Sequence, residues 1–126
     1  MTDTDHLTIL GNTVREPSKS LETFAAPARC TEVRFDTDEW TSLCPVTGQP
    51  DFGSVTIRYR PRHRCIESKS LKLLLWSFRD EAHFVETLAS ILAQEVVDAA
   101  DPEWVEVTVR QNVRGGIGTR ATARVG

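Results

Sequence analysis

The sequence predicts an α+β fold in which two helices cover one face of a four-stranded antiparallel sheet. Two segments that alternate between apolar and polar residues precede the middle of the chain, and two more follow it. Between them, apolar residues recur every three or four positions, which is the spacing of amphipathic helices. This order of strands and helices is typical of a sheet whose helices lie together on one side. With 126 residues, the chain is expected to form one domain over residues 1–126.

The first half of the chain is predicted to supply an N-terminal arm and two strands. Residues 1–29 are expected to be irregular, with a short strand or edge at Leu7 to Leu10. Cys30 to Phe35 alternates and is rich in strand-forming residues, so it is predicted as the first strand of the sheet. Val55 to Arg60 alternates in the same way and is predicted as a half-buried second strand. Pro61 to Arg64 is then expected to form a polar turn.

The second half is predicted to supply two helices and the last two strands. One helix is expected from Ser68 to about Arg79, and a second from about Glu81 to Ala99, with Phe84 on its apolar stripe. An Asp-Pro pair stops the second helix. Trp104 to Val109 and Ile117 to Val125 are predicted as strands. Four strands leave two open sheet edges, and open edges on a short chain favour joining to other copies.

The composition excludes several classes of function. The net charge is −3, so the chain lacks the basic excess that a surface for nucleic acid or an acidic membrane normally needs. No apolar run approaches the roughly 20 residues that span a bilayer, and the first ten residues lack the pattern of a signal peptide. The three cysteines are an odd number without a close pair. We therefore expect a reduced, cytoplasmic chain with at least one free thiol.

The segment from Thr41 to Phe52 holds a cysteine and an acid at a set separation. Cys44 and Asp51 are separated by two prolines and a glycine, residues that restrict or widen the choice of backbone conformation. A thiolate is a strong nucleophile, and a carboxyl held near it can supply a proton. The segment is therefore predicted to be a loop that carries a catalytic pair. An ordinary turn, with a buried cysteine and a solvent-facing aspartate, is an equally good interpretation of the residue types alone.

A second candidate site lies at the start of the first predicted helix. Ser68 is a credible N-cap, and the N–H groups of the first turn would then be exposed. Lys69 and Lys72 are three residues apart and share a helix face, so the segment could bind an anion such as a phosphate. The spacing alone favours an ordinary capped amphipathic helix with solvated lysines.

Two further charged residues could contact a ligand. Glu86 lies off the apolar stripe of the second helix and could bind a ligand that offers N–H donors. Arg114 precedes two glycines and could belong to a plain turn or contact an anion. The histidines and cysteines do not have the spacing of metal ligands, so no metal site is predicted.

Four segments resemble those of a known enzyme family. TSLCPVTGQPDF, ESKSLKLLLWSFR, Phe84 with Glu86, and RGGI are similar to the short, single-module form of the NADPH-dependent nitrile reductases. These enzymes belong to the tunnelling-fold superfamily and convert 7-cyano-7-deazaguanine to 7-aminomethyl-7-deazaguanine for queuosine in transfer RNA. The resemblance implies a tunnelling fold whose sheets join into the barrel of a ring-shaped homo-oligomer, with sites between subunits.

The resemblance also implies a role for each candidate residue. Cys44 would attack the nitrile carbon to form a covalent thioimide, and Asp51 would protonate the nitrile nitrogen. NADPH would then deliver hydride twice. The remaining residues would bind ligands: the cofactor at Lys69, Lys72 and Arg114, and the deazaguanine at Ile66, Glu67, Ser68, Val85 and Glu86.

The chain departs from the family pattern beside Glu86. The family has a histidine before this glutamate, whereas Val85 stands there and cannot relay a proton. Two other functions remain open beside the reductase. One is an amidinotransferase that adds ammonia or an amine to the same thioimide. The other is a non-catalytic protein that binds the deazaguanine base.

Overall fold

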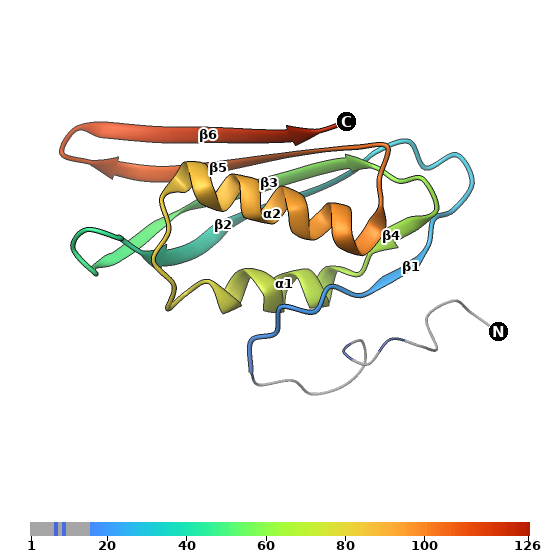
Figure 1. The fold of residues 1–126 in the computed structure, drawn as a ribbon, viewed down its shortest axis with the longest axis horizontal. Helices are drawn as coiled ribbons and strands as arrows, with labels where there is room; N and C mark the ends of the chain where they lie inside the picture. The colour runs from blue at the N-terminus through green and yellow to red at the C-terminus, as the bar shows by residue number, and fades with distance from the viewer. Residues whose placement is uncertain (1–6, 8, 10–15) are drawn as a thin grey trace.

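Four long antiparallel strands form the main sheet, and two helices lie together on one of its faces (Figure 1). The structure is a computed structural model, and it describes Leu7, Ile9 and residues 16–126. The strand order is β2-β3-β5-β6, and the helices are α1 and α2. The predicted fold class is thereby confirmed. The bounds are β2 Val33–Leu43, β3 Pro50–Arg60, α1 Ser68–Ser77, α2 Val85–Ala100, β5 Trp104–Arg114 and β6 Ile117–Val125.

A second, smaller sheet joins the N-terminal arm to the body of the protein. It consists of β1 (Thr23–Ala25) and β4 (Arg64–Ile66), which pair antiparallel. The prediction that residues 1–29 are irregular is therefore wrong at β1, and the predicted turn at Pro61 to Arg64 leads into β4. Strands of three residues are too short to show an alternating pattern. The predicted strand at Leu7 to Leu10 lies largely outside the described residues.

The strands of the main sheet differ in length from the predicted ones. β2 begins three residues after Cys30 and continues through Leu43, and β3 begins at Pro50. Most of the expected loop is therefore a hairpin. The pairing of β2 with β3 shifts between Thr37 and Trp40, and such an irregularity interrupts the alternation from which a strand is recognised.

The hydrophobic core lies between the sheet and the helices. Each of the two central strands, β3 and β5, contributes alternate side chains, and both helices cover them. The buried Tyr59 hydroxyl accepts a hydrogen bond of 2.7 Å from the Ile66 backbone N–H, which fixes β4 against the sheet. Residues that share this core include Val55, Ile57, Leu74, Leu88, Leu92, Val96, Val105, Val107 and Val109.

Each helix begins at a different point from the predicted one. α1 is capped by Glu67 and not by Ser68. α2 begins at Val85 and not near Glu81, because the Glu81 carbonyl accepts a 2.9 Å hydrogen bond from the Leu43 N–H and so belongs to the edge of the sheet. Phe84, which was predicted on the buried stripe, is 58% exposed.

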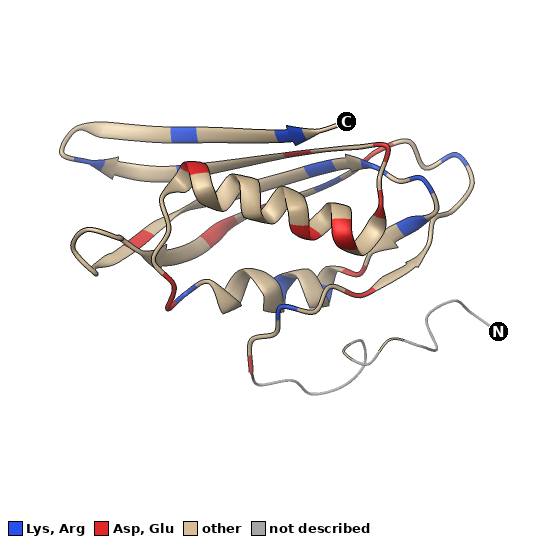
Figure 2. Cartoon of the chain, viewed as in Figure 1, with Lys and Arg blue, Asp and Glu red and all other residues tan. Residues whose placement is uncertain are grey.

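The two ends of the molecule carry different elements. The β2–β3 and β5–β6 turns and the start of α2 lie at one end, whereas β4 and the start of α1 lie at the other (Figure 1). Charge is also divided between the sheet edges: β6 carries two arginines and no acid, and β2 carries three acids and one arginine (Figure 2). No helix in the described part of the chain is long and apolar enough to cross a membrane.

Candidate active site

Cys44 lies directly after β2, where a tight turn presents it to solvent. The Cys44 N–H donates to the Gln49 carbonyl at 2.8 Å, and the Gly48 N–H donates to the Cys44 carbonyl at 2.9 Å. Gly48 has a φ of +71°, a conformation that glycine adopts without steric cost. The thiol is half-buried and free of disulfides. The alternative of a cysteine packed inside the protein is therefore wrong.

The surroundings of Cys44 favour its ionised form. The pKa of the Cys44 thiol is lowered to about 7, chiefly by the Thr47 hydroxyl and then by the backbone N–H groups of Thr47 and Val46. The Arg114 guanidinium adds a further hydrogen bond. The Thr47 oxygen also accepts from the Gln49 N–H at 3.2 Å, so its proton is free to point at the sulfur. A large fraction of the thiol is thus ionised near neutral pH.

Asp51 lies close to Cys44 on the helix-facing side of the sheet. It pairs with Ser42 across the β2–β3 hairpin, and Cys44 lies two residues beyond Ser42, directly after the end of β2. Side chains two residues apart face the same way. Asp51 is 4% exposed, so the alternative of a solvent-facing aspartate is also wrong. The neighbouring Ser42 hydroxyl is buried and has no hydrogen-bond partner among the described residues.

Arg114 joins the thiol and the carboxyl. Its Nη1 forms an ion pair with Asp51 Oδ1, and its guanidinium is near enough to Cys44 to help lower the pKa of the thiol. The sequence did not predict this contact, since Arg114 was grouped with the cofactor-binding lysines. The structure places Arg114 with the predicted catalytic pair.

The start of α2 lies beside the same hairpin. Leu43 forms a bridge with Ala82 in the segment that leads into α2. Glu86 is exposed there, as predicted, whereas Val85 is 5% exposed and packs in the hydrophobic core. His83 is held by Glu81, whose carboxylate lies 2.9 Å from Nε2. Glu86 is therefore free to meet a ligand, and His83 is engaged elsewhere.

At the start of α1, a side chain of the protein itself occupies the predicted anion site. The Glu67 carboxylate accepts from the N–H groups of Lys69 and Ser70, at 2.7 and 2.8 Å. These are the backbone donors that a phosphate would need. Glu67, and not Ser68, is therefore the N-cap. Ile66, Glu67 and Ser68 together line an apolar cavity of about 500 Å³.

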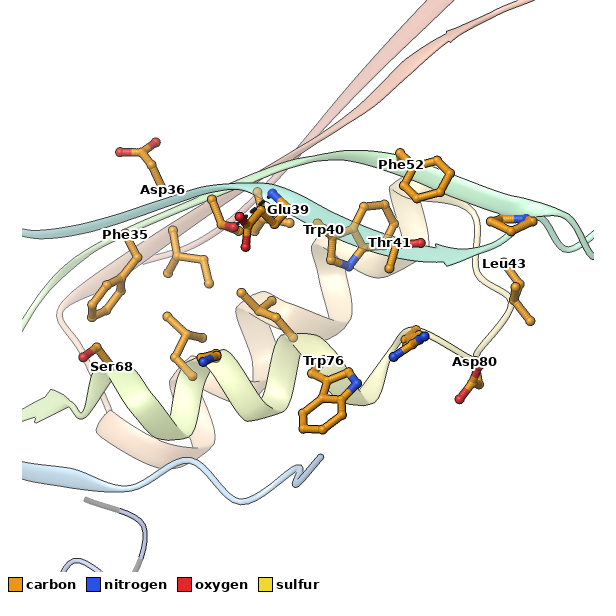
Figure 3. A pocket seen from close by; sticks show the side chains of 18 residues that line it. Phe35, Asp36, Glu39, Trp40, Thr41, Leu43, Phe52, Ser68, Trp76 and Asp80 are labelled. Atoms are coloured by element: carbon orange, nitrogen blue, oxygen red, sulfur yellow. Dashed lines mark hydrogen bonds between the residues drawn. The ribbon is translucent and has the colours of Figure 1, made fainter. Parts of the chain in front are cut away.

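A larger cavity, of about 710 Å³, lies between α1 and β2 (Figure 3). Trp40 of β2 and Trp76 of α1 both line it. The Trp40 indole N–H is buried without a partner among the described residues, so it offers an unused donor. Two basic residues, Lys72 and Arg79, and three acidic ones line the cavity, the acids being Asp36, Glu39 and Asp80. Lys69 is not part of the lining. The two tryptophans suit an aromatic ring of a ligand, and Lys72 and Arg79 are the groups of the lining that could meet an anionic part of it.

Comparison with known proteins identifies the family. Residues 50–126 match the family model described as "QueF-like protein". The NADPH-dependent 7-cyano-7-deazaguanine reductase of Anaeromyxobacter sp. (strain Fw109-5) is 48% identical over 113 residues, which are 88% of this chain and 93% of that one. The chain belongs to the QueF-like family. The resemblance to the nitrile reductases is thereby confirmed.

Other members of the QueF-like family agree with this assignment. The reductase of the same name from Thiobacillus denitrificans is 46% identical over 109 residues, with 85% of this chain and 78% of that one covered. The crystal structure of an archaeosine synthase QueF-Like in the apo form matches with a TM-score of 0.72 and 29% identity. That match covers 76% of this chain and 94% of the other.

In this QueF-like chain, the predicted site residues fall into two groups. Cys44, Asp51 and Arg114 are in contact at one end of the molecule, with the start of α2 beside them. Ile66 to Ser68 lie at the other end, where α1 begins (Figure 1). The sequence analysis missed Thr47 and Trp40. Thr47 could have been recognised, because a threonine in a tight turn often accepts a hydrogen bond from the backbone N–H two residues later. No sequence pattern marks Trp40.

Proposed function

We propose that the chain is an NADPH-dependent reductase that converts the nitrile of 7-cyano-7-deazaguanine to a primary amine. One observation carries the proposal: a free, half-buried thiol with a pKa of about 7 lies beside a buried carboxyl. The name of the relatives that share up to 48% of its residues supports the choice of substrate and cofactor. The three free cysteines suit a reducing cytoplasm.

The first step is the addition of Cys44 to the nitrile carbon. The sulfur forms a bond to carbon, one π bond of the C≡N group breaks, and its electron pair takes a proton on nitrogen. Asp51 supplies that proton, since it is the acid beside the thiol. The product is a thioimide. Its reduction to the primary amine would take two hydrides from NADPH and two protons, and the C–S bond would break so that Cys44 is again a free thiol.

The binding residues would hold the two ligands in place. Lys72 lines the cavity of about 710 Å³ between α1 and β2, where two tryptophans suit the rings of the cofactor and Lys72 and Arg79 could meet its phosphates. Lys69 would assist from the same helix. Glu86 would accept hydrogen bonds from the N–H groups of the deazaguanine, because it is exposed at the start of α2.

We further propose that the complete site needs two copies of the chain. Ile66 to Ser68 lie too far from Cys44 to meet the same small substrate within one copy, because they are at opposite ends of the fold (Figure 1). The outer edges of β2 and β6 carry no strand in the described part of the main sheet. Their opposite charges suit the pairing of β6 in one copy with β2 in the next, which would build a ring.

The proposal is tested by incubation with 7-cyano-7-deazaguanine and NADPH. The absorbance of the reduced cofactor should fall, with two cofactor molecules consumed for each amine formed. Without NADPH, mass spectrometry should find the nitrile added to Cys44, and Cys44→Ala should abolish the adduct. An intact cofactor together with an unmodified Cys44 would refute the reductase.

A second candidate is an amidinotransferase acting on the same thioimide. It is favoured by the structural likeness to the archaeosine synthase QueF-Like. Saturable NADPH binding that is lost in Lys69→Ala would exclude it. An adduct that ammonia releases as an amidine, with no use of NADPH, would support it instead. A stable adduct that neither reagent releases would indicate the non-catalytic binder.

A further inference from the structure

The Arg114 guanidinium touches both members of the proposed catalytic pair. It is ion-paired with the buried Asp51 carboxylate, and it contributes to the lowered pKa of the Cys44 thiol. Arg114 and Asp51 are 63 residues apart in the sequence. The contact between Arg114 and Asp51 therefore depends on the fold.

The backbone is shaped to bring Arg114 to this place. The β3–β5 pairing ends at Gly53 and Gln111, and the β5–β6 pairing is irregular between Gln111 and Arg114. Regular alternation from the buried Val109 would turn Val113 toward the helices and Arg114 away from them. Instead Val113 is 66% exposed and Arg114 reaches the buried carboxyl. Irregularities of this kind re-aim side chains beside active sites.

We propose that Arg114 is a positioning residue that holds Asp51 beside the Cys44 sulfur and stabilises whichever of the two groups carries the negative charge. This inference rests on the proposed function. An ion pair requires an ionised carboxyl, whereas a proton donor must be protonated. Arg114 resolves the conflict if Asp51 receives its proton from Cys44, because the guanidinium contacts the carboxylate before the transfer and the thiolate after it.

The step balances without an external acid or reductant. The S–H bond of Cys44 breaks, and the proton passes to Asp51. The sulfur then bonds to the nitrile carbon, and Asp51 returns the proton to the nitrile nitrogen. The net result is addition of S–H across C≡N, with the Asp51 carboxylate again paired to Arg114.

The other charged groups around the hairpin are engaged or exposed. Glu81, in the segment that pairs with Leu43, binds Lys19 and His83 at 2.6 and 2.9 Å. Glu86 faces solvent at the start of α2. Among the described residues, Arg114 is the cation in contact with Cys44 and Asp51. It is therefore the residue to vary.

Two reactions of Cys44 separate this role from a merely structural one. Alkylation by iodoacetamide needs only the thiolate, whereas addition to 7-cyano-7-deazaguanine needs the proton transfer as well. Both rates are measured from pH 5 to 9 by mass spectrometry, without NADPH, for the natural chain, Arg114→Gln and Arg114→Lys. Arg110→Gln, an exposed residue of the same strand, is the matched control.

In Arg114→Gln, alkylation at pH 7 should slow by only about twofold to threefold, because Thr47 and two backbone N–H groups still stabilise the thiolate. Addition to the nitrile should slow by a further factor of about ten or more. Arg114→Lys, which keeps the charge, should recover part of the addition rate, and Arg110→Gln should change neither rate.

The proposal is overturned if both rates fall by the same factor, or if neither changes. A natural chain that is alkylated near neutral pH but never adds the nitrile would instead refute the proposed function. If Arg114→Gln does not fold, as judged by circular dichroism, the same two rates in Arg114→Lys decide: unequal losses support the proposal, and equal losses or no loss overturn it.

Discussion

The chemistry of the site depends on how single residues are placed around Cys44. A cysteine with its ordinary pKa would be mostly protonated at neutral pH. The turn after β2 changes this, because it directs two backbone N–H groups and the Thr47 hydroxyl at the sulfur. Thr47 is the one of these donors that a substitution can remove, and it provides the largest contribution.

Thr47→Val should raise the pKa of Cys44. Valine has nearly the shape of threonine but donates no hydrogen bond, so the thiolate loses its first stabilising partner. A higher pKa means less thiolate at pH 7, and alkylation by iodoacetamide at that pH should slow by roughly threefold to tenfold. The measurement is the alkylation rate from pH 5 to 9.

Thr47→Ser is the matched control, since it keeps the hydroxyl. Its alkylation profile should stay within about half a pH unit of the natural one. An unchanged midpoint in Thr47→Val would show that the backbone donors alone hold the thiolate.

At this scale, the sequence indicated candidate residues but not their contacts. Cys44 and Asp51 lie in one short segment, so their spacing alone made them candidates. The sequence did not show whether either side chain is buried, because burial depends on which face of the hairpin each residue occupies. Arg114 comes from a distant strand, and its approach depends on an irregularity that no local pattern predicts.

At the scale of whole elements, the start of α1 combines a structural and a binding role. Glu67 is buried and accepts from two N–H groups of the first helical turn. Its backbone N–H also donates to the Glu22 carbonyl at 2.8 Å, which ties the N-terminal arm to the helix. This cap therefore orders the segment that is proposed to line the substrate pocket.

Glu67→Ala should destabilise the protein by about 1–2 kcal/mol, because it leaves two buried N–H groups without a partner. The free energy of unfolding is measured by urea denaturation. Glu95→Ala, in α2, serves as the control and should change the free energy by less than about 0.5 kcal/mol. Equal losses in the two variants would contradict the assignment of Glu67 as the cap.

The start of α2 explains why the missing histidine cannot simply be restored. Val85 packs in the core, so Val85→His would place a polar ring among apolar side chains. We expect a loss of about 1–3 kcal/mol in the free energy of unfolding. Turnover of NADPH, measured well below the melting temperature, should not rise. A faster and equally stable variant would mean that residue 85 reaches the substrate.

Element types were predictable where the periodic pattern was long. Both helices and all four strands of the main sheet were expected from apolar spacing. The ends were not, because Leu43 pairs with residues that precede α2 and so delays the start of that helix. β1 and β4 exist only as partners of each other, and neither has a pattern of its own.

At the scale of the whole molecule, the proposed function divides the site between two ends of one copy. Cys44 lies at one end, and the residues proposed to line the base lie at the other. Opposite edges of the sheet carry opposite charge, which favours a directional, head-to-tail pairing of copies. A ring formed in this way would repeat the same interface at every junction.

Mixing two inactive variants tests whether the site is shared. Cys44→Ala removes the nucleophile, and Ser68→Trp should block the base pocket, because Ser68 lines the cavity beside Glu67. Each variant alone should be inactive. If a site takes Cys44 from one copy and Ser68 from the next, random mixing in equal amounts should restore about a quarter of the natural activity. If each copy holds its own site, nothing should be restored.

The control mixture combines the natural chain with the double variant Cys44→Ala/Ser68→Trp. Shared sites should then keep about a quarter of the natural activity, because both contributing copies must be natural, whereas sites within one copy should keep about half. The two mixtures therefore give matching values only for a shared site. Subunits are exchanged by unfolding in urea and refolding together, and activity is followed by the oxidation of NADPH. If the mixture of single variants is inactive and the control mixture keeps about half of the natural activity, the whole site lies within a single copy.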